Sequence, residues 1–90
     1  MRTIVLDGLY MNTREATHEY LARRLHFPSY YGRNLDALHD LLTEPCEPTQ
    51  IILYRKTCML QKLGDYGEIL LTVLRDAASE NASLRFAEDN

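Results

Sequence analysis

Hydrophobic and polar positions along the chain fall into blocks that predict three short strands. Residues 3–6 are β-branched or apolar and are followed by Asp7-Gly8, a combination typical of a strand that ends in a turn. Residues 51–54 form a second, fully apolar block, whereas residues 83–87 alternate between apolar and polar side chains. Continuous apolar runs are typical of strands buried on both faces or placed at the centre of a sheet, and we expect this for the first two strands.

Apolar residues at helical spacing separate these blocks. The expected helices cover about residues 13–25, 34–43, 56–63 and 66–79. Asn12 and Glu15 stand at the spacing of a capping box where the first helix begins, and Pro28 follows its end. The last helix carries an apolar stripe that we assign to the core, made of Ile69, Leu70, Val73, Leu74 and Ala77.

The order of these elements, β-α-α-β-α-α-β, determines the expected fold class. Strands joined by helical crossovers pair in parallel. The pattern therefore predicts an α/β protein with a three-stranded parallel sheet and packed helices. A chain of 90 residues can form one hydrophobic core, so we expect a single domain over residues 1–90.

Composition and charge exclude several classes of function. The net charge is −3 and the basic residues are scattered, which argues against direct binding of nucleic acid or of an anionic membrane. No apolar run approaches the ~18 residues of a membrane span, and no signal-peptide core is present, so we expect a cytoplasmic protein. The histidines and the two cysteines, Cys46 and Cys58, lack metal-ligand spacing. We therefore expect no metal, no cofactor and reduced thiols.

The second expected helix holds the most unusual charge pattern. Asp36, Asp40 and Glu44 recur at every fourth position, so they form one ridge opposite the leucines. Like charges at this spacing destabilise a helix by roughly 0.2–0.5 kcal/mol per pair. Glu44 also lies near the helix C-terminus, where the macrodipole disfavours an anion. The ridge is either an ordinary solvated face, which the spacing alone favours, or a surface that meets a cationic partner.

The residues before this helix extend the candidate surface. Tyr30 and Tyr31 precede it in a loop, and tyrosines beside charged residues are common in interfaces. Tyr31 could equally be a core anchor under the helix. We expect Asn34 to cap the helix whatever its other roles. The helix carries His39 between two aspartates, an arrangement that could serve acid–base catalysis, but a convex helix offers no evident pocket and we expect no enzyme.

The run from Phe27 to Thr43, Phe-Pro-Ser-Tyr-Tyr-Gly-Arg-Asn-Leu-Asp-Ala-Leu-His-Asp-Leu-Leu-Thr, closely resembles the signature of the barstar family. That signature joins a proline, a tyrosine pair and a glycine to Asn-Leu-Asp-Ala-Leu, an aromatic residue and an aspartate. Weaker similarity extends over the whole chain, through Gly8 after the first strand, Val73–Ala77 in the last helix and a short terminal strand. The family fold is the parallel sheet with packed helices predicted above.

The resemblance implies an intracellular protein that inhibits a ribonuclease and catalyses no reaction. In the family, the aspartate matching Asp40 lies where a substrate phosphate would lie, and the one matching Asp36 meets basic residues of the enzyme. The tyrosine matching Tyr30 packs on the catalytic surface, and Asp76 matches a glutamate that makes a peripheral charge contact. The partner-binding surface implied in this way comprises Tyr30, Gly32, Asn34, Asp36, His39, Asp40, Thr43, Glu44 and Asp76.

Three departures from the family pattern surround the two aspartates. His39 replaces a tryptophan, Arg33 replaces an acid, and Glu44-Pro45 replaces a glycine and an aromatic residue. The expected partner is a ribonuclease with a basic active site, bound one to one. Because the surroundings differ, the alternative is that the same fold binds a toxin or regulator that is not a ribonuclease.

Overall fold

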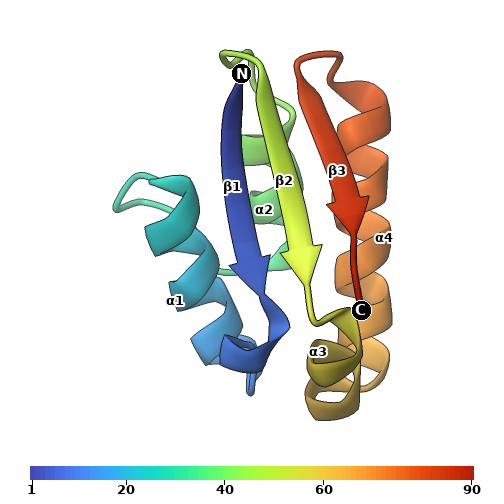
Figure 1. Cartoon of the computed structure of the whole chain (residues 1–90). Coiled ribbons are helices and arrows are strands. Elements are labelled where there is room, and N and C mark those ends of the chain that lie inside the picture. The colour runs from blue at the N-terminus through green and yellow to red at the C-terminus, as the bar shows by residue number, and fades with distance from the viewer.

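The structure of the chain, a computed structural model, describes all of residues 1–90 as one sheet with helices behind it (Figure 1). The strands are β1 (Arg2–Asp7), β2 (Thr49–Tyr54) and β3 (Leu84–Glu88). The helices are α1 (Arg14–Leu25), α2 (Leu35–Leu42), α3 (Lys56–Leu63) and α4 (Asp65–Glu80), with a short 3-10 helix, η1 (Gly8–Tyr10), after β1. This confirms the predicted order β-α-α-β-α-α-β. None of the helices is both long enough and apolar enough to cross a membrane.

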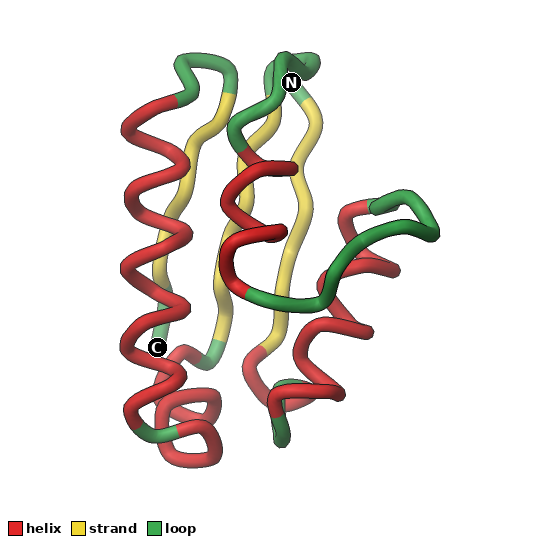
Figure 2. Tube along the Cα trace, turned by 180° about the vertical axis from the view of Figure 1, so that it is seen from behind, coloured by secondary structure: helices red, strands yellow, loops and turns green.

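The three strands pair in parallel in the order β1-β2-β3, as predicted. Each crossover therefore moves one strand further in the same direction across the sheet. Crossovers between parallel strands are right-handed, so two crossovers that run in the same direction must lie on the same face. Figure 2, which views the molecule from behind, accordingly shows α2 and α4 side by side in front of the strands.

Of the two arrangements expected for the first two strands, burial on both faces is wrong, whereas a position at the centre of the sheet is confirmed for β2. In β1 and β2 every second residue is buried, as Ile4, Leu6, Ile51 and Leu53 show. The residues between them point to the face without helices, where Val5 keeps 43% of its surface exposed. An apolar run can thus come from a strand that is covered on one side only, because β-branched residues favour strands whether or not both faces are covered.

The core lies between the sheet and the helices. Helix α4 contributes Leu70, Leu74 and Ala77, as the sequence predicts, together with Leu71. Ile69, which we assigned to the core, is 51% exposed, and Val73 is only partly buried. The buried face of α4 is therefore rotated by a fraction of a turn from the predicted stripe.

The termini of α1 are defined by side-chain and backbone caps. The N-cap is Thr13 and not Asn12, because the Thr13 hydroxyl accepts a hydrogen bond of 3.0 Å from the backbone N–H of Ala16. The predicted capping box is therefore displaced by one residue. At the other end His26 adopts the left-handed conformation that commonly terminates helices, two residues before Pro28.

The end of the sheet is held by one carboxylate that receives two cations. Glu88 in β3 accepts hydrogen bonds from both Nε and Nη2 of Arg75, at 2.6 and 2.7 Å, and a third from Lys56 at 3.2 Å. The hydrogen bonds from Arg75, with a smaller contribution from Lys56, lower the pKa of Glu88 to about 2 against the opposing effect of burial. The contacts join β3 to both α3 and α4.

We expect Glu88→Gln to lower the free energy of unfolding at pH 7 by about 1–2 kcal/mol, because charged hydrogen bonds are lost. Since folding lowers the pKa of this group, its contribution is complete above the ordinary value of 4.5 and is lost as the pH falls toward 2. Urea unfolding across this range should show the difference between the two proteins shrinking with acidification. Glu47→Gln, which removes an exposed contact to Arg2, is the matched control with little effect. Coincident unfolding curves for wild type and Glu88→Gln at pH 7 would show that the charge of Glu88 does not stabilise the fold.

Candidate functional site

Helix α2 begins with a well-formed cap. The Asn34 side chain accepts a hydrogen bond of 2.8 Å from the backbone N–H of Ala37, and its Nδ2 donates to the carbonyl of Gly32 at 3.2 Å. The predicted capping role of Asn34 is thus confirmed. Asp36 lies in the first helical turn, where the positive end of the helix macrodipole stabilises its negative charge. The start of α2 is therefore stabilised around the first of the two aspartates.

The acidic ridge predicted on this helix consists of two residues and not three. Asp36 and Asp40 are exposed and lie one turn apart on α2, while Leu38 and Leu42 are buried in the core. The helix ends at Leu42, with Thr43 as its C-cap, so Glu44 lies outside it. Glu44 is exposed beside the helix terminus but does not continue the ridge.

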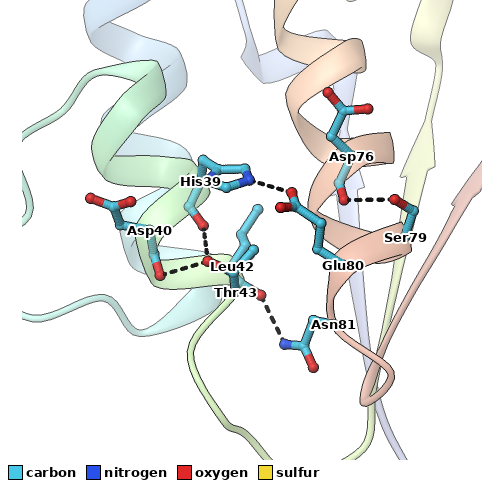
Figure 3. Close-up of polar contacts among 8 residues, drawn as sticks. All are labelled: His39, Asp40, Leu42, Thr43, Asp76, Ser79, Glu80 and Asn81. Carbon is cyan, nitrogen blue, oxygen red and sulfur yellow. Dashed lines mark hydrogen bonds and ion pairs between the residues drawn. The ribbon is translucent and has the colours of Figure 1, made fainter.

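Hydrogen bonds from two side chains hold the end of α2 (Figure 3). The Thr43 hydroxyl turns back to the carbonyls of His39 and Asp40, at 2.8 and 3.3 Å. The amide of Asn81, directly after α4, donates to the carbonyls of Leu42 and Glu44 at 2.9 and 3.2 Å. Carbonyls that a helix terminus leaves without partners are thus satisfied, and the ends of α2 and α4 are tied together.

His39 joins the same two helices at the surface. Its Nε2 lies 2.5 Å from Oε2 of Glu80 in α4, and Figure 3 shows its ring turned toward Glu80 while the Asp40 side chain points away from α4. The hydrogen bond to Glu80 raises the pKa of His39 above its ordinary 6.5. Desolvation opposes this increase, and the charges of Glu80, Asp40 and Asp76 add smaller contributions in the same direction as the hydrogen bond.

Glu80 was not among the residues predicted from the sequence. It follows Asp76 at the same four-residue spacing that relates Asp36 to Asp40, and that repeat in the last helix is the signal that could have found it. Asp76 itself is exposed on α4, as a partner-binding role requires. Because α2 packs beside α4, the two pairs of acids lie on adjacent helices. We call Asp36, Asp40, Asp76 and Glu80 the acidic surface.

The loop between α1 and α2, residues 26–34, separates its two tyrosines. Tyr30 is 78% exposed, as expected of a residue that meets a partner, whereas Tyr31 is only 6% exposed and belongs to the core. A Cβ atom on Gly32 would lie 3.1 Å from Nδ2 of Asn34, so a larger residue would press on the cap of α2. Arg33 reaches away from α2 and forms an ion pair of 2.5 Å with Glu19 in α1.

An open groove of about 520 Å³ lies between α1 and the start of α2, where the sequence indicated no concave site. Its lining is mostly polar and carries both signs of charge, with Glu15, Glu19 and Asp36 beside Arg14 and Arg33. The groove does not assemble the acid–base set considered above, because the ring of His39 is hydrogen-bonded to Glu80 and not to either aspartate. No group of three or more His, Cys, Asp or Glu side chains is placed to hold a metal ion.

The two cysteines are free and lie at opposite ends of β2. Cys46 is exposed in the segment that precedes the strand, and Cys58 is partly buried in α3, which follows it. The Asn81 amide lies 3.8 Å from the Cys46 sulfur. The separation of the two sulfurs along the whole strand prevents a disulfide between them.

Comparison with known proteins gives consistent matches over nearly the whole chain. The profile of the family described as "Barstar (barnase inhibitor)" matches residues 1–87. A curated relative from Bacillus subtilis (strain 168), named "Putative ribonuclease inhibitor YrdF", is 40% identical over 81 residues, which cover 89% of each chain. Both matches include the loop and α2.

We expect an NMR titration of the imidazole resonances to give a pKa for His39 above the ordinary 6.5, because protonation strengthens its bond to Glu80. Glu80→Gln should move this pKa back toward or below 6.5. Glu44→Gln removes an acid that does not contact the ring and should leave the pKa where it is. An unchanged titration in Glu80→Gln would show that the contact is not formed in solution.

Proposed function

Because this chain belongs to the barstar family of ribonuclease inhibitors, we propose that it inhibits a ribonuclease by placing α2 and the preceding loop in the enzyme's basic active site. As a member of that family it is not an enzyme. One observation carries the proposal. Asp36 and Asp40 are exposed on successive turns of α2 and form no ion pair within the chain, so both carboxylates are available to a cationic partner.

The contact between His39 and Glu80 supports the same proposal. His39 is the only residue on α2 that can carry a positive charge, and its ring is turned to the acid of another helix. The two aspartates therefore remain free to take cationic partners from outside. A nuclease site lined by arginine and lysine offers such partners where it would hold RNA phosphates.

In this mechanism the carboxylates of Asp36 and Asp40 take the place of substrate phosphates. Tyr30, projecting from the loop, would pack on the catalytic surface and keep water and RNA out. Asn34 and Gly32 would hold the loop against α2, while Thr43, Glu44 and Asp76 would border the contact. One such surface per chain corresponds to a one-to-one complex, which we place in the cytoplasm.

The second candidate is a barstar-fold protein whose partner is a different basic protein. The observation that favours it is that two of this chain's own residues at the site, Arg33 and His39, form ion pairs with Glu19 and Glu80 and so change the charge around the aspartates. Titrating the protein into RNA cleavage assays with several small microbial ribonucleases separates the candidates. Stoichiometric loss of cleavage for at least one enzyme supports the first, and undiminished cleavage for all of them supports the second.

We expect Asp40→Ala to weaken the complex with the inhibited ribonuclease by about 2–5 kcal/mol, or ~30-fold or more, because a buried cation of the enzyme would lose its partner. Complexes of this family are themselves among the systems from which that range was measured. Glu44→Ala should cost less than ~5-fold, because Glu44 lies beyond the helix at the border of the contact. Calorimetric titration of both variants, after a check that both unfold like the wild type, tests the ranking. Equal and small effects would contradict the proposed mechanism.

We also expect affinity for the ribonuclease to fall as the pH decreases through the pKa of His39, which lies above 6.5. The charged imidazole would face a cationic enzyme site, so binding disfavours the protonated form. His39→Gln has no such charge, and its affinity should exceed that of the wild type at low pH and approach it as the pH rises. Parallel binding curves for the two proteins over pH 5–9, a range of about two units on each side of neutrality, would contradict this effect.

A further inference from the structure

The loop that carries Tyr30 is attached to the rest of the protein through a buried histidine. His18 in α1 is only 2% exposed. Its Nδ1 lies 2.6 Å from the hydroxyl of Tyr31 in the loop, and its Nε2 lies 2.6 Å from the hydroxyl of Tyr66 in α4. A single imidazole thus joins the loop, α1 and the first turn of α4. We call these three side chains the tyrosine–histidine clamp.

The chemistry of the clamp suits a neutral imidazole. The ring nitrogen that carries hydrogen donates a hydrogen bond to one tyrosine oxygen, while the other nitrogen accepts a hydrogen bond from the second hydroxyl. Burial lowers the pKa of His18, although Glu15 acts in the opposite direction. Burial raises the pKa of both Tyr31 and Tyr66, which keeps the two phenols protonated. All three side chains therefore have hydrogen-bonding partners in the interior.

The other polar contacts of this loop are local or exposed, and beside the clamp it is held by the packing of Phe27 and Tyr31 in the core. Asn34 bonds only to the loop itself and to α2, and the backbone N–H of Tyr31 donates to the carbonyl of Pro28 within the loop. Arg33 pairs with Glu19, but both side chains are about half exposed or more, and such pairs contribute little. The bond from Tyr31 to His18 is the only side-chain hydrogen bond from residues 26–34 to an element other than α2.

Tyr66 completes the clamp from the far side. Its ring is covered by the guanidinium of Arg14 at 4.4 Å from the centroid, and its hydroxyl holds the second nitrogen of His18. Tyr66 belongs to α4, the helix that also carries Asp76 and Glu80. Through His18, the loop is therefore connected to the helix that carries half of the acidic surface.

We propose that His18 is a positioning residue, which holds the loop of Tyr30 in its partner-binding conformation through bonds to Tyr31 and Tyr66. This inference rests on the proposed function for its effect on binding, but its effect on the loop belongs to the free protein. A loop held in place before binding loses less conformational entropy in the complex. If the clamp is broken, only a fraction of molecules present the correct loop at any time, and affinity falls by that fraction.

The test is Tyr66→Phe, which removes one hydroxyl from the clamp and leaves Tyr31 and the proposed contact residues unchanged. Amide hydrogen exchange of the free protein is measured at the Tyr31 N–H, whose bond to Pro28 reports on the loop. Tyr20→Phe is the matched control, because it removes a hydroxyl of α1 that bonds to the N–H of Asp7, away from the loop. We expect faster exchange at Tyr31 in Tyr66→Phe than in Tyr20→Phe, while core amides of β2 change equally in both.

Binding to the inhibited ribonuclease should weaken by about 3- to 10-fold in Tyr66→Phe and by less than ~2-fold in Tyr20→Phe. His18→Gln, whose amide can both donate and accept, should retain more protection at Tyr31 than His18→Leu, which can do neither. Unchanged exchange at Tyr31 in Tyr66→Phe overturns the proposal. A uniform loss of protection that Tyr20→Phe reproduces does the same, since it indicates a general stabilising role.

If Tyr66→Phe loses protection of the Tyr31 amide but binds the ribonuclease as tightly as the wild type, the loop conformation does not limit binding, and that part of the proposal is overturned. The exchange experiment needs no partner, so it decides whether the clamp holds the loop even if the chain inhibits no ribonuclease. Conversely, a ribonuclease that is inhibited equally well by wild type and Tyr66→Phe leaves the proposed function intact and removes the positioning role of His18.

Discussion

Two crossover connections that lie on the same side of the sheet determine how the rest of the protein is arranged. Because both are right-handed and both advance in the same direction, α2 and α4 must pack beside each other on one face. The contacts between the two helices at the candidate surface follow from this adjacency. His39 can reach Glu80, Asn81 can cap the end of α2, and four acids on two helices can share a surface.

The acidic residues of β3 and of α2 have different surroundings. At the end of the sheet, Glu88 is enclosed by Arg75 and Lys56, and its charge contributes to stability. On α2, Asp36 and Asp40 are left without cations although they repel each other. A helix that carries unpaired like charges is less stable than it could be, and in the proposed complex the cations of the partner would recover that energy.

The sequence predicted the elements of the fold well, because each depends on local spacing. The strands and helices, the cap at Asn34 and the exposure of Asp36 and Asp40 could all be read from neighbouring residues. The errors arose where distant residues decide the outcome. Glu44 falls outside α2 because it precedes Pro45, which disfavours a helical backbone there, and the carbonyls at this helix end are bonded by Asn81, which is far away in the sequence. Local spacing contains no information on that contact.

The same limit applies to the site. The pairing of His39 with Glu80 and of His18 with Tyr66 depends on which helices become neighbours, so neither followed from the pattern. Both-face burial of the strands was expected from their composition, which cannot tell a covered face from an open one. The resemblance to the barstar family supplied Asp76, which no local pattern singles out, whereas Tyr30 already stood beside the acidic residues in the sequence.

The open face of the sheet has a consequence for how this protein can vary among related chains. Residues such as Val5, Ile52 and Ala87 pair across the three strands there, away from α2 and the acidic surface. Substitutions on that side need only preserve the preference for an extended backbone, whereas those on the helical side must also preserve packing and charge. We therefore expect related chains to differ most on the open face of the sheet. Differences there would reflect the time since two chains diverged, whereas differences on the helical side would reflect a change of partner.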